Sequence, residues 1–592
     1  MATAVALKSG GSGGGRKRNL GDILVEQGVI TPLELDEALQ RQRLTGDFLG
    51  RVLVKMELCE EQDILEALGV QQGMERVDLT KFKIKDEVLR KIPPDVARFY
   101  NVVPVRIREN GVLVVALANP LDLNLLDDIS QIVGGPVEGA VSNLADVTHA
   151  IKSNYSYEGE DVSQTLQQLV EKVGDKELSM EELGQQQIVG DVENLVELAQ
   201  EPEIIKIVNL VLLEAVQKKA SDIHFEVYEE DFRIRLRVDG VLHEIVAPPK
   251  AISIAVVSRA KVMSNMDIGE RRLPQDARIE LKIGDSDIDV RVGTLPTLFG
   301  ECVVMRILDR TSVQTSLPKL GLAQGLRDDI STIINKSSGL FLVTGPTGSG
   351  KTTTLYACVS ELNEVGSKII TCEDPVELQI EQLVQVQIRE EIGLTFAAAL
   401  RAILRQDPDI IMVGEVRDLE TANMCIEAAL TGHFVLSSIH TNSSVETVTR
   451  LLDMDVEAFL ITSALEGILA QRLVRKVCRD CRQPYKPEPS EMDELGVPKS
   501  WRKSGDLKLY RAKGCPACDY VGYKGRTGIY ELLKINDDLR EMILSRKMTH
   551  EMRKYARKNL GMLTLREEAL IKAAQGITTA EEVIHHTELF VD

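Results

Sequence analysis

The sequence feature that most constrains the fold is the segment GPTGSGKT at 345–352. It fits the pattern G-x-x-x-x-G-K-[ST], and the context that the pattern requires is present, since a strand-like apolar run precedes it and a helical pattern follows it. The glycines let backbone N–H groups converge on phosphate oxygens at a helix N-terminus. We expect Lys351 to reach the β- and γ-phosphates of a nucleotide and Thr352 to bind Mg²⁺. The residues predicted to contact the nucleotide are Gly345, Pro346, Thr347, Gly348, Ser349, Gly350, Lys351, Thr352 and Thr353.

Polar side chains also end three further strand-like runs. Glu415 follows "PDIIMVG", the pair Glu373-Asp374 ends "KIITCED", and His440 ends "HFVLSSIH". Because the carboxyl ends of parallel strands share one edge of a sheet, these groups can meet one ligand there, as in a RecA-like motor core. Glu415 would then polarise the attacking water. For any one acid alone a solvated strand end is the more ordinary interpretation, but the shared position favours a catalytic site.

Length and charge limit the classes of protein. A chain of 592 residues is too long for one hydrophobic core, so three or four domains are expected. The formal net charge of −21 argues against a large nucleic-acid footprint, which needs clustered Lys and Arg. No apolar run reaches the length that spans a bilayer, so we expect a cytoplasmic protein that touches the membrane only through partners.

Composition shifts and turn signals divide the chain into five parts, which together predict a multidomain α/β protein. They are a disordered tail over 1–17, an N-terminal regulatory or docking domain over 18–154, an acidic linker over 155–202, a second α/β domain over 203–312, and the nucleotide-binding domain over 320–592. The signals include the hairpin turn Asn110-Gly111 in the first domain and Asp239-Gly240 in the second.

An internal repeat opens the ordered part of the chain. The segment 20–42 aligns with 49–71 on matching Leu-Gly pairs and later leucines. Each copy predicts a short helix, a turn and a second helix, and Thr31-Pro32 supplies a cap followed by a first helical position. Two interpretations stay open: a duplicated helical hairpin that buries its own leucines, and a ligand-binding element.

Four of the nine cysteines form two paired motifs, Cys478-x₂-Cys481 and Cys515-x₂-Cys518. Two such knuckles suit tetrahedral Zn²⁺ bound by four thiolates, and a cytoplasmic redox pair is the weaker alternative. The spacing between the knuckles is long, so a loop must be inserted, and we place the whole metal module at about 476–520. Four thiolates leave no open coordination position, so the zinc is predicted to be structural.

Several motifs together resemble the secretion ATPases that power type II secretion and type IV pilus extension. "GPTGSGKTTT" resembles their Walker A box, "TCEDPVE" their aspartate box, "LRAILRQDPDIIMVGEVRD" their Walker B region and "TGHFVLSSIHTN" their histidine box. "ASDIHFE", "RLRVDG" and "RRLPQDAR" resemble the preceding domain. The resemblance implies a RecA-like ATPase domain behind a PAS-like α/β domain, and a cytoplasmic homohexamer at the inner membrane with each ATP site between two subunits.

The resemblance also implies roles for matching positions. Glu415 is the catalytic glutamate, and the aspartate-box acids support Mg²⁺ and water. Arg291 and Arg306 match arginines that the domain before the motor moves toward the ATP site. Without the resemblance, a surface ion pair would be the more ordinary interpretation of each arginine. The predicted catalytic residues are Glu415, Glu373, Glu377, Lys351, Arg291, Arg306 and His440, and Thr352 and Asp374 are the predicted Mg²⁺ residues. His433, Arg401, Arg405 and Arg417 also match family positions.

The N-terminal repeat resembles the cyclic-di-GMP-binding domain of some members of that family. Their pattern has an Arg directly before the first Leu-Gly and a Gly before the second helix of each copy. Here Asn19 precedes Leu20, with Arg18 one residue earlier, and Glu57 stands where the first copy has Gly28. Docking to a membrane partner's cytoplasmic domain is the alternative role, and an inner-membrane platform protein is the second partner that the resemblance implies.

Three other functions compete. RecA-like hexamers often translocate nucleic acid, but the acidic charge and few stacking aromatics disfavour this. A kinase would need an acceptor site, and none is recognisable. Pilus retraction motors resemble this motor but usually lack the zinc insertion and the long N-terminal region. Sequence motifs barely separate type II secretion from pilus extension, so both pathways stay open.

Overall fold

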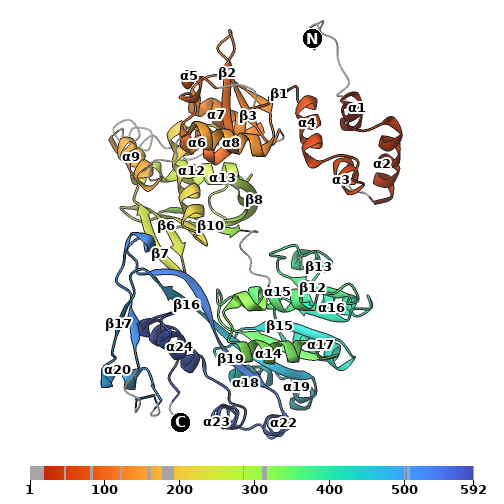
Figure 1. Cartoon of the computed structure of the whole chain (residues 1–592), viewed down its shortest axis with the longest axis vertical. Coiled ribbons are helices and arrows are strands. Elements are labelled where there is room, and N and C mark those ends of the chain that lie inside the picture. The colour runs from red at the N-terminus through yellow and green to blue at the C-terminus, as the bar shows by residue number, and fades with distance from the viewer. Residues whose placement is uncertain are drawn as a thin grey trace. The chain divides into compact units, whose positions relative to one another are not determined.

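A computed structural model describes residues 19–45, 48–79, 84–120, 123–155, 162–175, 192–283, 286–309, 316–498, 501–502 and 507–590. The chain forms two compact units, Met1–Thr311 and Ser312–Asp592, and each is considered by itself (Figure 1). The tail predicted over 1–17 lies outside the described residues. No helix within the described ranges is both long and apolar enough to span a bilayer.

The first unit begins with the predicted helical repeat. Its helices are α1 (Leu20–Glu26), α2 (Pro32–Thr45), α3 (Leu49–Lys55) and α4 (Glu61–Gln71). Ile23, Leu24, Val52 and Leu53 are buried in a common core. The turns after α1 and α3 are alike, since Gly28 has φ +74° and Glu57 has φ +55°. Glu57 therefore holds a left-handed conformation that favours glycine, which explains how the second copy keeps the geometry of the first.

A four-stranded α/β layer follows the repeat. Its strands are β1 (Glu75–Arg76), β2 (Val102–Ile107), β3 (Leu113–Leu117) and β4 (Val137–Val141), in the order β1-β4-β3-β2. Its helices are α5 (Asp86–Leu89), α6 (Pro94–Tyr100), α7 (Leu123–Val133) and α8 (Leu144–Asn154). The hairpin predicted at Asn110-Gly111 joins β2 to β3, where Gly111 has φ +83°.

Two helices occupy the described parts of the predicted acidic linker. They are α9 (Val162–Asp175) and α11 (Val192–Ala199). Leu166 and Val170 of α9 are buried against the apolar side chains of α12 (Pro202–Gln217). The linker composition is acidic, but apolar residues at helical spacing give α9 a face that can pack. Leu166 and Val170 thus belong to the core of the second α/β domain.

The second α/β domain is an antiparallel sheet covered on one face by helices. Its strands are β5 (Asp222–Val227), β6 (Phe232–Val238), β7 (Val241–Val246), β8 (Gln275–Ile283), β9 (Ser286–Thr297) and β10 (Gly300–Asp309), in the order β7-β6-β5-β10-β9-β8. A short helix η1 (Lys250–Ile252) leads into α13 (Ser253–Met263). Phe225, Ile234 and Met305 alternate inward and pack with α12 and α13, so the polar side chains of these strands lie on the other face.

The second unit has a seven-stranded sheet in the order β13-β12-β14-β15-β11-β16-β19. The strands are β11 (Gly339–Thr344), β12 (Ile369–Glu373), β13 (Val384–Gln387), β14 (Ile410–Val413), β15 (Phe434–Ile439), β16 (Leu465–Val477) and β19 (Tyr523–Lys534), and all neighbours are parallel except β16 and β19. The four strands predicted to end in polar groups are thus parallel neighbours, which confirms the RecA-like core.

Helices cover both faces of this sheet. Phe341 and Val343 face a core shared with η2 (Leu317–Leu320), α14 (Gln324–Ile334) and α15 (Lys351–Leu362), whereas Leu340 and Leu342 face the other core. The helices that contribute residues to that other core are α16 (Phe396–Ile403), α17 (Leu419–Leu430), α18 (Ser444–Asp453), α19 (Ala458–Ala464), α22 (Asp537–Leu544) and α23 (Thr549–Asn559). A short helix, η3 (Glu390–Ile392), precedes α16. Buried residues of β11 point alternately to the two sides, as a fully covered parallel strand requires.

The insertion between the two cysteine pairs carries its own small sheet. The sheet pairs β17 (Gln483–Tyr485) with β18 (Leu509–Arg511), and α20 (Pro489–Glu494) lies between them in the chain. The short helix η4 (Pro516–Cys518) follows within the second cysteine pair. Leu495, Val497 and Leu509 are buried with residues of α24 (Leu565–Ala574) and α25 (Ala580–His586). The predicted inserted loop is therefore a packed module where the structure describes it.

Candidate functional site: a phosphate loop beside a carboxylate cluster

The phosphate loop begins directly after buried strand β11 and ends in α15. Gly345 has φ +152° and Gly350 has φ +88°, and both lie in regions that side chains disfavour. A Cβ at Gly345 would stand 2.4 Å from the backbone oxygen of Gln471, so the loop could not keep this path with a larger residue. The local sequence thus folds as the phosphate-binding pattern requires.

Lys351 curls back over its own loop. Its Nζ donates to the carbonyl oxygens of Gly345 at 2.9 Å and Pro346 at 3.2 Å. Burial lowers the pKa of this ammonium, and the nearby carboxylate of Glu415 opposes the shift. Thr352, the next residue, is exposed and so is open to a metal ion at the start of α15. The predicted cation and hydroxyl therefore both stand at the phosphate loop.

Gln471 of β16 braces this loop, and sequence reasoning missed it. Its Nε2 donates to the carbonyl of Ser349 at 2.7 Å, and its Oε1 accepts from the hydroxyl of Thr354 at 2.7 Å. It is almost fully buried. Nothing in the sequence around Gln471 indicates this role, because the loop that it contacts lies 122 positions earlier in the chain.

Replacing Gln471 with Leu is expected to raise the dissociation constant for ATP roughly tenfold, since a buried carbonyl and hydroxyl left unpaired cost about 1–3 kcal/mol. Titration with a fluorescent ATP analogue measures this. The control variant Gln483→Leu changes an exposed amide of β17 and should bind ATP as the unchanged chain does. Unchanged affinity in Gln471→Leu would show that the brace is unimportant for the loop.

Glu415 lies in a cluster of charges at the carboxyl end of β14. Its Oε1 accepts from Arg417 Nη2 at 2.5 Å, and its Oε2 lies 3.2 Å from His440 Nε2. Burial acts to raise the pKa of Glu415, but the bond and charge of Arg417, with the charge of His440, outweigh it and lower the pKa. Arg417 Nη1 also lies 3.4 Å from Asp374. One guanidinium therefore joins the acids of two neighbouring strands.

Glu373 differs from the other predicted acids because it is buried and fully bonded. It accepts from the Tyr356 hydroxyl, from Thr371 Oγ1 at 2.6 Å and from Gln385 Nε2 at 3.1 Å. Burial, together with the charge of Glu373, raises the pKa of Tyr356. The Tyr356 hydroxyl in turn accepts the backbone N–H of Glu377 at 3.2 Å. These bonds make Glu373 an anchor that ties the aspartate box to α15.

The two histidines of the histidine box stand at opposite ends of β15. His440 follows the strand and joins the cluster around Glu415, whereas His433 precedes it, beside the start of β11. His433 Nδ1 lies 2.9 Å from the carbonyl oxygen of Ala428. The structure therefore brings only His440 to the phosphate loop of its own chain. Arg401 pairs with Glu420 on the helical face and is likewise outside the cluster.

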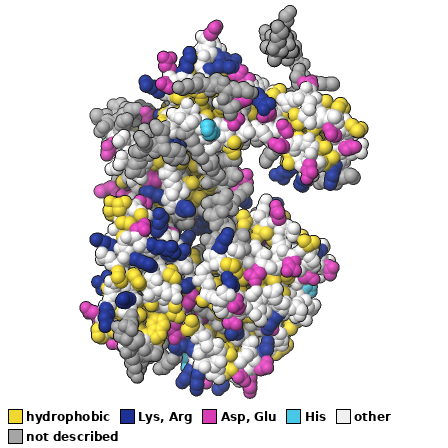
Figure 2. All heavy atoms as spheres, in the orientation of Figure 1, with side chains coloured by type: hydrophobic (Ala, Val, Ile, Leu, Met, Phe, Trp, Pro, Cys, Tyr) yellow, Lys and Arg dark blue, Asp and Glu magenta, His cyan; other side chains and the backbone are white. Residues whose placement is uncertain are grey.

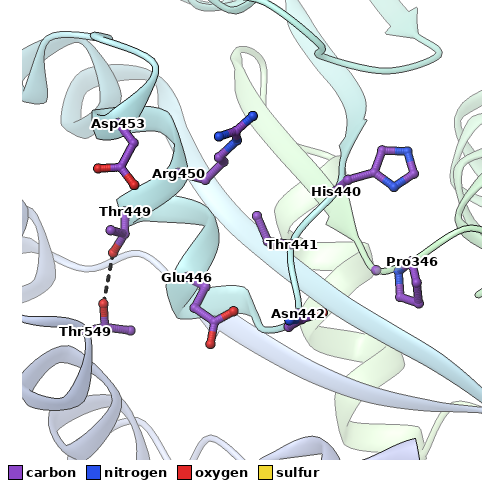
Figure 3. Close-up of a pocket in the computed structure, with 10 residues that line it drawn as sticks. Pro346, His440, Thr441, Asn442, Glu446, Thr449, Arg450, Asp453 and Thr549 are labelled. Carbon is purple, nitrogen blue, oxygen red and sulfur yellow. Dashed lines mark hydrogen bonds between the residues drawn. The ribbon is translucent and has the colours of Figure 1, made fainter.

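A cavity of about 390 Å³ adjoins the phosphate loop (Figure 3). Pro346 and His440 lie on one side of it, and α18 presents Glu446, Arg450 and Asp453 on the other. Thr449 and Thr549 close it with a hydrogen bond of 3.0 Å. The site thus has a polar, open space next to its first loop residues.

Arg291 and Arg306 belong to the other unit, where they are directly paired on β9 and β10. Arg306 has 57% of its side chain exposed and donates to Asp222 through Nε at 3.0 Å. The two predicted arginines therefore stand side by side on the polar face of the antiparallel sheet.

The four paired cysteines converge as predicted. Their sulfurs all lie within 4.8 Å of one another, with 3.8 Å between Cys478 and Cys515, 3.9 Å between Cys481 and Cys518, and 3.7 Å between Cys515 and Cys518. Four sulfurs bound to one zinc ion at about 2.3 Å stand about 3.8 Å apart at tetrahedral corners. A disulfide would need about 2.05 Å. Backbone N–H groups of Cys515 and Gly522 donate to Cys518 Sγ at 3.2 Å, which suits a thiolate.

Comparison with known proteins agrees with this site. The model of the family described as "Type II/IV secretion system protein" matches residues 197–585, and that of the MshEN domain matches residues 72–161. The chain belongs to this family of secretion ATPases. It is 41% identical over 571 residues to the type IV pilus assembly ATPase PilB of Myxococcus xanthus, covering 96% of this chain and 98% of that protein.

Relatives whose names refer to type II secretion are as similar to this chain as the pilus assembly ATPase is. The type II secretion system protein E of Xanthomonas campestris is 41% identical over 571 residues, covering 96% of this chain and 98% of its own length. The type II secretion system ATPase E of Vibrio cholerae is 48% identical over 396 residues, covering 67% and 78%. The predicted family and enzyme class, an ATP-hydrolysing secretion ATPase, are confirmed. The comparisons therefore do not support the kinase and nucleic-acid translocase hypotheses.

Surface charge is consistent with that outcome. On the face that Figure 2 shows, acidic side chains occur among basic ones on both units. With a net charge of −21, the secretion ATPase lacks the overall excess of positive charge that is typical of proteins that bind nucleic acid along an extended surface.

Proposed function

We propose that Glu415 is the general base of ATP hydrolysis in this secretion ATPase. The observation that carries the proposal is its placement: a partly buried carboxylate, held by Arg417 and His440, at the same sheet edge as the phosphate loop. The two hydrogen bonds aim the carboxylate and keep it ionised, so it is ready to accept a proton. As water oxygen attacks the γ-phosphorus, Glu415 takes the proton and the bond to the bridging oxygen breaks, giving ADP and phosphate.

The phosphate loop holds the other reactant. Backbone N–H groups of the loop and the Lys351 ammonium neutralise the polyphosphate, and the carbonyl contacts that Lys351 makes now would give way to phosphate oxygens. Thr352 and Asp374 would hold Mg²⁺, which supplies further charge neutralisation at the phosphates. His440, which contacts Glu415, would act as a sensor of the γ-phosphate. Glu373 contributes by fixing the aspartate box, because its oxygens are already bonded.

We further propose that the active form is a hexamer in which Arg291 and Arg306 reach the phosphates bound by a neighbouring subunit. Arginines delivered in this way stabilise charge on the transferring phosphoryl group. Support comes from their directly paired positions on β9 and β10, from the exposed side chain of Arg306, and from the resemblance of the surrounding motifs to those of the family.

Mixing variant subunits tests the composite site. Arg291→Ala and Glu415→Gln chains should each be inactive, but random mixed rings should regain about a quarter of wild-type sites, since one quarter of interfaces join an intact Glu415 to an intact Arg291. ATP hydrolysis after mixing in equal amounts measures this. A mixture as inactive as its components would mean that Arg291 acts within its own chain or not at all.

The work done by hydrolysis would be the assembly of pilin-like subunits by an inner-membrane platform, in type II secretion or type IV pilus extension. The relatives bear both names, so a deletion strain scored for secreted enzymes and for surface pili separates the pathways. We propose that the tetracysteine module binds structural zinc and contacts the platform, and that the motor is peripheral at the cytoplasmic face of the inner membrane.

The N-terminal repeat would receive the regulatory input. We propose cyclic-di-GMP as the first ligand to test, because both copies keep the same left-handed turn, at Gly28 and at Glu57. Calorimetric titration of the full chain decides this. Absence of binding would favour the alternative role, docking to a membrane partner's cytoplasmic domain.

A further inference from the structure

One row of charged residues crosses five strands of the antiparallel sheet. In register from strand to strand are Arg237 on β6, Asp222 on β5, Arg306 on β10, Arg291 on β9 and Arg278 on β8. Residues directly opposite in neighbouring strands share a face, and like charges placed opposite each other are unfavourable. Asp222 is the single acid in a row of four arginines, and it stands between Arg237 and Arg306.

The Asp222 carboxylate is buried and held from several sides. It is 6% exposed. One oxygen, Oδ1, accepts from Arg306 Nε at 3.0 Å, while Oδ2 accepts from the Ser221 hydroxyl at 2.8 Å and lies 3.5 Å from Arg237 Nε. Bonds on both oxygens fix the plane of the carboxylate. The direction of the carboxylate is therefore set by Ser221 as well as by the arginines on the neighbouring strands.

Arg306 uses only the inner part of its guanidinium for this bond. Among the described residues, no hydrogen bond involves its terminal nitrogens, and 57% of the side chain is exposed. A guanidinium offers its two terminal groups as a fork that matches two phosphate oxygens. With Nε bonded to Asp222, the two terminal nitrogens remain available to a ligand. Arg291, directly opposite, would otherwise push Arg306 aside by repulsion.

We propose that Asp222 is a positioning residue that aims Arg306 at the transferring phosphoryl group. This inference rests on the proposed role of Arg306 in ATP hydrolysis. Asp222 fixes Nε and leaves both terminal nitrogens free for the phosphate. It also offsets part of the positive charge that the neighbouring arginines place beside Arg306. The motif "ASDIHFE" would thus hold part of the catalytic machinery although Asp222 itself touches no substrate.

A double-mutant cycle tests the proposal on the full-length protein. Asp222→Asn should lower kcat about tenfold and leave the KM for ATP unchanged, because aiming matters in the transition state. In an Arg306→Gln background, Asp222→Asn should cause no further loss, since the residue it aims is gone. The control Arg237→Gln removes the other arginine beside the carboxylate, and its kcat should stay within about twofold of wild type.

The outcomes separate this inference from the function on which it rests. Wild-type kcat in Arg306→Gln would overturn the proposed role of Arg306 itself. A large loss in Arg306→Gln with none in Asp222→Asn would overturn only the positioning role. An equal fractional loss from Asp222→Asn in both backgrounds would also overturn it, because a carboxylate that merely stabilises the domain acts whether or not Arg306 is present.

Discussion

Glu415→Gln is expected to bind ATP normally and to hydrolyse it about 10²- to 10⁴-fold more slowly, the range that a lost general base produces. The amide keeps the shape of the carboxylate and an oxygen for Arg417, so the cluster at the end of β14 persists. It has no charge to draw a proton from water. Steady-state ATPase rates and binding of a fluorescent ATP analogue, measured on the same preparation, give both halves.

Lys351→Ala is the complementary variant and should lose both ATP binding and hydrolysis, because the β- and γ-phosphates lose their cation. The matched control for Glu415→Gln is Glu427→Gln, which neutralises an exposed carboxylate of α17 in the same unit and should leave the rate of ATP hydrolysis unchanged. If Glu415→Gln lost binding and turnover together, the carboxylate would be part of the binding site and a different acid would be the base.

Cys515→Ser is expected to unfold the metal module while ATP binding survives. The wild-type chain should carry about one Zn²⁺, bound by the four thiolates. Structural zinc supplies on the order of 10 kcal/mol or more in small modules, far above what the short β17–β18 pair can replace. Strand β16, which contains Gln471 and ends directly before Cys478, is also held by pairing with β11 and β19. That pairing should stop the unfolding before it reaches the phosphate loop.

Metal analysis, ATP titration and a secretion or pilus assay in cells test this prediction together. Zinc and the platform function should be lost in Cys515→Ser, and ATP affinity should be kept. Cys302→Ser, which changes a cysteine of the other unit, should retain the metal. A zinc-free wild type would refute the metal site, whereas loss of ATP binding in Cys515→Ser would refute the separation of the two sites.

Local patterns were enough for the phosphate loop, the helical repeat and the cysteine pairs. In each, the chemistry lies within a few residues: the glycines of 345–350 set their own backbone path, and each Cys-x₂-Cys turn presents two sulfurs together. The shared edge of four parallel strands was also predictable, because polar residues that end parallel strands lie together at the carboxyl edge of the sheet.

The sequence by itself therefore determined the family, the ATP chemistry and the groups at the sheet edge. Only the tertiary structure decided that Glu373 is an anchor bonded to Tyr356 and that Gln471 braces the phosphate loop. It alone placed Asp222 against Arg306, 84 residues along the chain. These roles depend on which side chains meet across strands and helices, and a bond between distant positions leaves no trace in the periodicity or spacing around either residue.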